Sequence, residues 1–299
     1  MDKIVECVPN FSEGRRAEVV EEIVRAMAIA GVKILDREMD ADHNRSVITL
    51  AGEPGAIEDA AFRGVAAAAR LIDLDAHRGE HPRIGATDVV PFVPVRGVTM
   101  DDCVAMARRL GERVARELDI PVYLYERAAT RPERRDLAYL RRGEYEALKR
   151  EIATNPDRAP DFGPTRIGKA GATVIGARPY LIAYNVNLAT SDLAIAKEIA
   201  ATVREKNGGL KSVKAKGFLL REKNIAQVSM NLTDFTVTGM LAAFDTVKTE
   251  ANKRGVQVLE SELIGLVPLE ALTQLAAHAL KLPALSAEQI VEMKLIEPP

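Results

Sequence analysis

In the first half of the chain, short apolar runs alternate with stretches whose apolar residues recur every three or four positions. The runs predict strands, and the recurring positions predict helices. Pro54 favours a helix start, because proline is well tolerated in the first turn. The expected strands cover residues 4–8, 32–38, 45–51, 89–95 and 122–125, and the expected helices cover residues 16–30, the stretch that Pro54 opens and the stretch from Val104 to Leu118.

The second half repeats the same order of elements. Strands are expected at residues 180–188, 214–220, 225–232 and 256–267. One helix follows Ser191, which is a suitable N-cap, and a second runs from Met240 to Ala251. Each half therefore contains the order β-α-β-β-α-β, the split βαβ arrangement, and the first half adds one helix and one strand after it. The pattern predicts an α+β fold of two ferredoxin-like subdomains.

The segment at residues 156–164 is a loop by composition and precedes Gly168, Gly171 and Gly176. It is either a linker or one wall of a ligand cleft between the halves. Polar residues alternate with apolar ones in strands 180–188 and 225–232, which predicts either a polar cleft lining or a solvent-facing sheet surface. We place the subdomains at residues 1–178 and 179–299.

Composition favours an enzyme that acts on small molecules. The 299 residues are 47% hydrophobic and carry a net charge of -2, which argues against nucleic acid or an anionic membrane as partner. Cys7 and Cys103 are too few for a disulfide framework, and no apolar stretch could span a bilayer. Charged residues interrupt the N-terminus before any signal-like run develops. We therefore expect a cytoplasmic protein.

Residues 77–88 contain two of the four histidines, together with arginine, glutamate and aspartate. His77 and His81 match the H-x-x-E-H zinc pattern, but that pattern needs a helix, which Gly79 and Pro82 disfavour. The segment is then either ordinary surface or a catalytic loop without metal. In the catalytic reading, His81 moves protons near neutral pH while Glu80 and Asp88 orient it.

Residues 40–46 combine two carboxylates, an imidazole and a guanidinium beside an expected strand. Asp40 and His43 fit an ordinary turn as well as a site. Arg45 is the stronger candidate, because a guanidinium can hold a carboxylate through two parallel hydrogen bonds. The arginine-rich stretch at residues 127–142 also contains acidic residues, so it is expected to be solvated surface, with contact to a polyanionic tail as the minor alternative.

Seven ordered segments carry distinctive motifs: residues 5–14, 79–86, 94–97, 121–125, 159–164, 224–229 and 265–268. Together they resemble the glutamate formiminotransferase family. The resemblance extends from about Val5 to about Leu272 and involves many long matches. Two departures stand out: the loop at residues 165–171 is about one residue shorter than in the animal bifunctional enzyme, and the chain has no tryptophan.

The resemblance implies transfer of the formimino group of N-formimino-L-glutamate to N5 of tetrahydrofolate, in histidine degradation. Tetrahydrofolate would be a co-substrate, and no metal is implied. The resemblance also implies a homodimer, with any cyclodeaminase a separate protein, since the chain ends at Pro299. The family's catalytic histidine matches His81, and its folate-binding loop matches Gly163, Pro164, Thr165, Arg166, Ile167, Gly168, Lys169, Ala170 and Gly171.

For the formimino donor, we expect the binding residues to be Asp40, Asn44, Arg45, Glu80 and Arg83. A nearby carboxylate would favour the cationic formimino group, and arginines would hold the substrate carboxylates. Three other readings remain: a folate-dependent glutamate formyltransferase, a zinc hydrolase built on H-x-x-E-H, and a folate-binding module without turnover.

Overall fold

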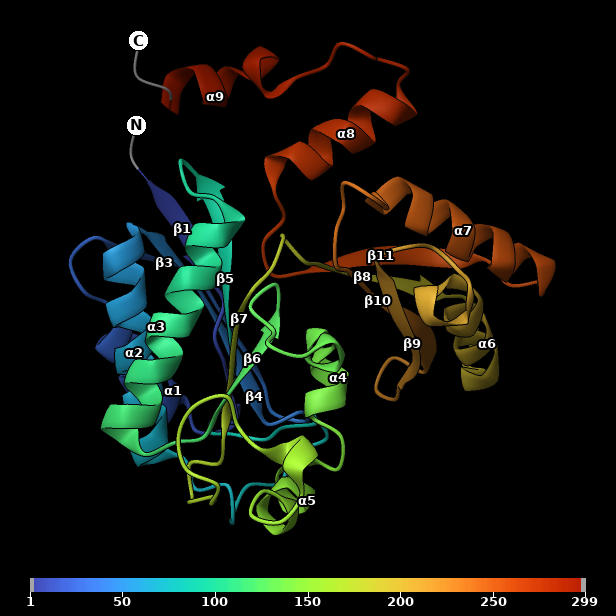
Figure 1. The fold of residues 1–299 in the computed structure, drawn as a ribbon. Coiled ribbons are helices and arrows are strands. Elements are labelled where there is room, and N and C mark those ends of the chain that lie inside the picture. Colours follow the sequence, from blue (N-terminus) through green and yellow to red (C-terminus); the bar gives the residue numbers. More distant parts are fainter. Residues whose placement is uncertain (1–2, 297–299) are drawn as a thin grey trace. The chain divides into compact units, whose positions relative to one another are not determined.

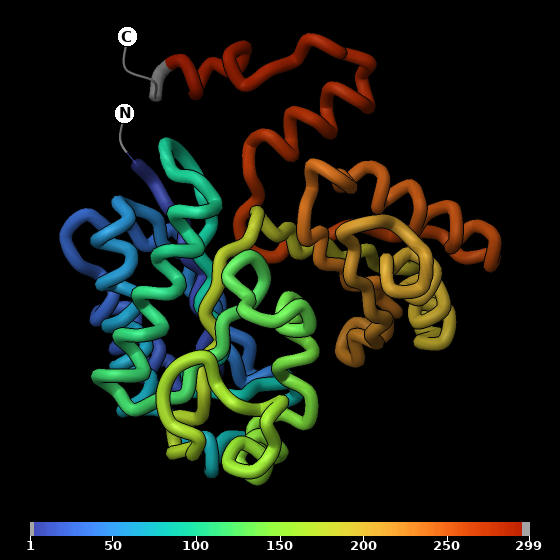
Figure 2. The backbone as a smooth tube through the Cα atoms, viewed as in Figure 1, coloured from blue at the N-terminus to red at the C-terminus, as the bar shows by residue number. Residues whose placement is uncertain are grey.

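The computed structural model describes residues 3–296 (Figure 1). It divides into two compact units, the first ending at Arg178 and the second beginning at Pro179. Each unit has its own sheet and its own buried core, so the fold is α+β. The path of the backbone through each unit can be followed in Figure 2.

A seven-stranded mixed sheet forms the centre of the first unit. Two short strands, β1 (Ile4–Cys7) and β2 (Asn10–Phe11), both lie antiparallel between β4 (Arg45–Gly52) and β5 (Thr87–Arg96). The edge strand β3 (Val32–Asp40) pairs with β4. On the other side, β7 (Thr173–Ala177) lies parallel to both β5 and β6 (Val122–Glu126).

Helices lie on both faces of this sheet (Figure 1). Successive side chains of β6 point to opposite faces of the sheet and enter two different cores. Val122 and Leu124 belong to the main core, whereas Tyr123 and Tyr125 belong to a smaller core with Leu140. The main core is built on α1 (Ala17–Met27), α2 (Pro54–Leu71) and α3 (Met100–Leu118), and the smaller core on α4 (Leu137–Leu140) and α5 (Glu144–Glu151).

The second unit contains a four-stranded antiparallel sheet with the order β11-β8-β10-β9. Its core is formed by the apolar residues of the sheet and by helices α6 and α7. The elements are β8 (Ile182–Leu188), α6 (Leu193–Val203), β9 (Val213–Leu220), β10 (Ile225–Leu232), α7 (Met240–Lys253), β11 (Val258–Ile264), α8 (Leu269–Ala279) and α9 (Val291–Ile296).

Most expected strands and long helices are present, with shifts of a few residues at their ends. The strand expected at residues 256–267 ends earlier, at Ile264, because Gly265 has a φ of +70° that an extended strand does not accommodate. Within residues 3–296, six strands and α-helices were not expected from the sequence: β2, β7, α4, α5, α8 and α9.

Two expectations were wrong. The segment at residues 156–164 is not a linker: it lies within the first unit, where Phe162 forms a bridge with Val122. The arginine-rich stretch is not uniformly solvated either. Arg134 is 1% exposed and forms a 2.6 Å ion pair with Asp161, because the segment folds back onto the sheet.

No helix among residues 3–296 is long and apolar enough to cross a membrane.

Candidate active site

The two segments singled out by sequence meet at one end of the first sheet. The turn between β3 and β4 carries Asn44, whose side-chain amide donates to the carbonyl oxygen of Arg78 at 2.9 Å. The backbone carbonyl of Asn44 is 3.0 Å from Nε2 of His77. The backbone N–H of Glu80 donates to the carbonyl of Asp42 at 3.3 Å. Residues 40–46 and 77–88 therefore form one surface.

The side chain of His77 is buried and holds neighbouring segments together. It is 7% exposed; Nε2 contacts the Asn44 carbonyl, and Nδ1 lies 3.2 Å from Nε of Arg83. Burial is the largest cause that lowers the pKa of His77. Residues 77–81 are not helical, as Gly79 and Pro82 predicted. With both nitrogens of His77 engaged, the H-x-x-E-H pattern does not present two free ligands in this conformation.

His81 is partly buried and lies beside His43, with their ring centroids 6.3 Å apart and the rings nearly perpendicular. His43 in turn contacts Asp40 through Nδ1 at 2.8 Å, and Asp40 also accepts the His43 backbone N–H at 2.8 Å. Burial lowers the pKa of His81 to about 2, with the charges of Arg45 and Arg141 as the next causes. The imidazole is therefore neutral at neutral pH, and it is a weak base while the two guanidinium charges act on it unopposed.

Arg45 and Arg141 approach this place from different parts of the chain. Arg45 begins β4 and donates through Nη2 to Oδ1 of Asn10 on β2. Burial lowers the pKa of Arg45 to about 10, and the charge of Arg141 is the next cause. Arg141 follows α4 and donates through Nη2 to Asp88. Two guanidinium groups are thus close enough to act on each other and on His81.

Asp88 is held by an irregularity in the sheet. The pairing of β2 with β5 matches Asn10 with Val89 and Phe11 with Thr87, so Asp88 has no partner in β2. Its Oδ1 accepts the backbone N–H of Ile84 at 2.8 Å. Irregularities of this kind redirect a side chain and often lie beside active sites.

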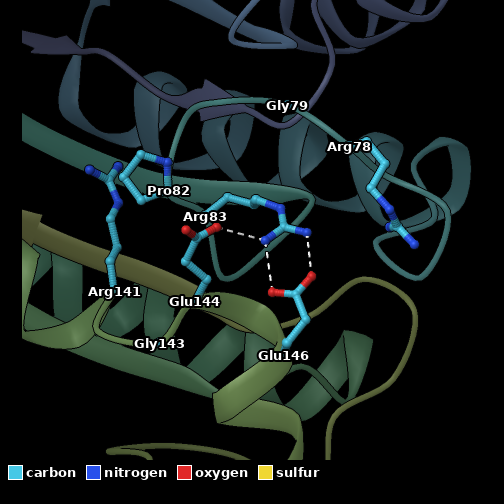
Figure 3. Close-up of a pocket in the computed structure, with 8 residues that line it drawn as sticks. All are labelled: Arg78, Gly79, Pro82, Arg83, Arg141, Gly143, Glu144 and Glu146. Atoms are coloured by element: carbon cyan, nitrogen blue, oxygen red, sulfur yellow. Dashed lines mark hydrogen bonds and ion pairs between the residues drawn. The ribbon is translucent and has the colours of Figure 1, made fainter.

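Arg83 and Arg141 both line a pocket of about 440 Å³ (Figure 3). The Arg83 guanidinium lies between two carboxylates, at 2.8 Å from Glu144 and 2.7 Å from Glu146. It is only 5% exposed. Figure 3 shows Arg141 extending towards Pro82, whereas Arg83 is turned towards the glutamates.

The remaining residues proposed for substrate binding differ in exposure. Asn44 is buried and joins the two segments, with Oδ1 accepting the Gly14 N–H at 2.9 Å. Glu80 is exposed, and Asp40 is exposed and paired with His43. Thus Arg45 lies beside His81, while Arg83 is bound to other carboxylates.

The expected folate loop lies against the same segment. Gly171 forms an antiparallel bridge with Gly85, and the backbone N–H of Leu74 donates to the carbonyl of Lys169 at 2.9 Å. The Lys169 ammonium is 2.9 Å from Asp73. Gly163, Thr165, Arg166, Gly168 and Lys169 are exposed, whereas Pro164, Ile167 and Ala170 are partly buried. The loop presents open backbone and two cationic side chains.

Sequence reasoning missed Arg141, Glu144 and Glu146. Their arginine-rich surroundings suggested a solvated surface, and only the contacts with Asp88 and Arg83 distinguish them. The available signal was the apolar spacing of Leu137, Leu140 and Leu148, which buries one side of this segment.

Two family models match the chain: residues 4–178 match the N-terminal subdomain of the formiminotransferase domain, and residues 183–296 match the formiminotransferase domain. A glutamate formimidoyltransferase of Thermoplasma acidophilum is 52% identical over 98% of this chain and 97% of its own length. One from Streptococcus pyogenes is 47% identical over 94% of each. The formimidoyltransferase-cyclodeaminase of Sus scrofa is 48% identical over 93% of this chain and 52% of its own length.

Proposed function

The chain belongs to the formiminotransferase family, and from this membership we propose that it transfers the formimino group of N-formimino-L-glutamate to N5 of tetrahydrofolate. The products are 5-formiminotetrahydrofolate and glutamate. The observation that carries the proposal is the 52% identity to a glutamate formimidoyltransferase over 98% of this chain. Tetrahydrofolate acts as a co-substrate and supplies the attacking nitrogen.

We propose that His81 is the general acid and base. Its imidazole takes the proton from N5 once N5 has bonded to the formimino carbon, because that nitrogen is then cationic and acidic. The resulting imidazolium then gives that proton to the glutamate nitrogen, which leaves as the carbon–nitrogen bond breaks. The proton is conserved, so the cycle needs no external acid. Proton transfer of this kind contributes roughly 10²–10⁴ in rate, and holding both substrates together supplies a further part.

The formimino donor is proposed to contact Asp40, Asn44, Arg45, Glu80 and Arg83. Arg45 is the best supported, because it is partly buried, lies two residues after the His43 that contacts His81, and acts on the His81 charge. Arg45→Lys keeps the charge but loses the planar fork. We expect the KM for formiminoglutamate to rise more than the KM for tetrahydrofolate. Arg83→Lys should raise the KM for formiminoglutamate less than Arg45→Lys does, because Arg83 is already paired with Glu144 and Glu146.

The proposed folate site is the loop from Gly163 to Gly171. Its exposed backbone and the cations Arg166 and Lys169 suit the carboxylates of a folate tail. A non-reactive folate analogue should slow hydrogen exchange of the backbone amides in this loop and around His81. Protection restricted to residues after Met240 would place the folate elsewhere.

We also propose the finer architecture and assembly. The two units are assigned as ferredoxin-like formiminotransferase subdomains, residues 1–178 and 179–299, with the ligand cleft between them. The strand order β11-β8-β10-β9 supports this for the second unit. A cytoplasmic homodimer is proposed, supported by the exposed Leu259 and Leu263 on the edge strand β11. Any cyclodeaminase would be a separate partner. Light scattering of the purified chain tests the dimer.

The decisive experiment is incubation with formiminoglutamate and tetrahydrofolate, followed by acid conversion of the product to the absorbing methenyl derivative. N-formyl-L-glutamate serves as the alternative donor, and a faster reaction with it would favour the formyltransferase reading. Loss of activity on chelation with one bound zinc per chain would favour the hydrolase reading. Folate binding without product from either donor would leave only a binding module.

A further inference from the structure

We propose that Arg45, which donates to Asn10, and Arg141, which is paired with Asp88, together bind the α-carboxylate of the formimino donor beside His81. This inference rests on the proposed function and assigns one of its substrate contacts to a residue, Arg141, outside the segments singled out by sequence. Three observations carry it: the balance of charge, the hydrogen-bond donors left without partners, and the position next to the imidazole.

Positive charge dominates at His81, because the guanidinium groups of Arg45 and Arg141 are the largest charges that act on its imidazole. Arg141 is ion-paired with Asp88, whereas Arg45 donates to the neutral amide of Asn10. The charge of Arg141 acts more strongly on Arg45 than that of Asp88, and Glu38 and Asp40 act more weakly still. Asp88 also accepts a backbone N–H from Ile84. The Asp88 carboxylate is thus occupied by Arg141 and by a backbone N–H, and an incoming carboxylate would offset the positive charge that acts on His81.

Unused donors lie on both arginines. Nε of Arg45 and Nε of Arg141 are each buried without a hydrogen-bond partner within residues 3–296. Buried polar groups are nearly always paired, so two unpaired guanidinium donors, one of them on a residue that lines the pocket of about 440 Å³, indicate a missing acceptor. A carboxylate offers two oxygens with several acceptor positions, and it suits planar guanidinium groups.

The α-carboxylate fits better than the γ-carboxylate for a geometric reason. In N-formimino-L-glutamate the α-carboxylate is attached to the carbon that bears the reacting nitrogen. A proton carrier must lie within hydrogen-bond reach of that nitrogen. Arg45 follows closely after His43, whose ring centroid is 6.3 Å from that of His81, so a carboxylate held by Arg45 lies near the nitrogen that His81 serves.

Donor binding would also change the proton affinity of His81. The groups that lower the pKa of His81, after burial, are Arg45, Arg141, His43 and His77. A bound carboxylate offsets the first two charges and so raises the pKa of the imidazole. The base would then become stronger when the donor is in place.

Arg141→Gln tests the carboxylate site in the full-length protein, with N-acetyl-L-glutamate as an unreactive probe and calorimetry as the measurement. We expect affinity to fall by roughly tenfold or more, as for loss of a charge-assisted hydrogen bond. Arg142→Gln is the matched control, because Arg142 is exposed and stacks on Tyr139. Arg141→Lys keeps a charge for Asp88, and it provides the measurement if the glutamine variant does not fold.

Two amide derivatives of the probe distinguish binding of the α-carboxylate from binding of the γ-carboxylate. N-acetyl-L-glutamine keeps the α-carboxylate and should lose affinity in the Arg141 variant by the same factor. N-acetyl-L-isoglutamine keeps only the γ-carboxylate and should be unaffected by the substitution. Equal losses for both amides would overturn the α-assignment, and unchanged affinity for N-acetyl-L-glutamate in both Arg141 variants would overturn the site itself.

The titration of His81 gives an independent measurement. Addition of N-acetyl-L-glutamate should raise the NMR-measured pKa of His81 in the parent protein, with a smaller rise in Arg141→Gln. No rise in the parent would overturn the electrostatic coupling. Probe binding that depends on Arg141, in a protein unable to transfer the formimino group, would support the anion site and overturn the proposed reaction.

Discussion

Gly85 and Gly171 form an antiparallel bridge that joins the proposed folate loop to the segment carrying His81. The bridge is flanked by hydrogen bonds from Ala86 N–H to the Ala170 carbonyl, at 2.8 Å, and from Ala172 N–H to the Ile84 carbonyl, at 2.9 Å. The end of the loop therefore cannot move without the segment that follows His81. This geometry links the proposed folate site to the proposed proton carrier.

Gly171→Ala should damage this connection. Gly171 has a φ of +72°, and an added Cβ would lie 2.3 Å from the Ile84 carbonyl oxygen. We expect a loss of unfolding free energy of about 1–3 kcal/mol and weaker tetrahydrofolate binding. Gly168→Ala is the matched control, because nothing lies within 4 Å of its added Cβ. Urea unfolding and folate titration measure both variants, and equal stability of the two would contradict the role of the bridge.

His81→Ala should lower kcat by roughly two to four orders of magnitude while tetrahydrofolate affinity changes little. His278→Ala provides the control, since His278 is exposed near the end of α8. Loss of the buried His77 contacts should act on stability more than on kcat. Steady-state kinetics decide the matter: turnover of His81→Ala within a few-fold of the parent would remove His81 from the mechanism.

Stability should decrease as pH falls from about 6.5 towards 5. The pKa of His81 is lowered to about 2 in the folded chain, so the unfolded chain binds a proton in this window that the folded chain does not. The unfolding free energy then rises with pH, and His81 alone accounts for up to about 2 kcal/mol between pH 5 and 6.5. Urea unfolding at several pH values should show a smaller slope for His81→Gln; an unchanged slope would mean that His81 titrates normally.

Arg134→Met should destabilise the first unit. Arg134 is 1% exposed and pairs with Asp161, which also accepts the Leu124 backbone N–H at 2.8 Å. Removal of one partner of a buried pair costs about 3–5 kcal/mol, because a charge is left unpaired. The exposed Arg135 gives the comparison, with an expected change within about 0.5 kcal/mol for Arg135→Met. Similar unfolding free energies for the two variants would show that the Arg134 pair contributes little.

The local pattern of apolar and polar residues was sufficient to predict the main helices and strands of both units. The spacing of Val19, Val20, Ile23 and Met27 predicted α1, and all four are buried. The breaks at Gly79 and Pro82 predicted a non-helical segment around His81, which the structure contains. These features depend on backbone preferences and on apolar periodicity within one element, so neighbouring residues are enough to determine them.

The sequence by itself determined the α+β class, the family and the two segments that meet around His81. Tertiary structure decided the rest: the position of β7 within the first sheet, the pairing of Arg83 with Glu144 and Glu146, and the approach of Arg141 to Asp88. Such contacts join residues more than fifty positions apart. Their formation depends on which buried charges find partners in the folded chain, and an arginine beside several acidic residues in sequence gives no sign of which one it will meet.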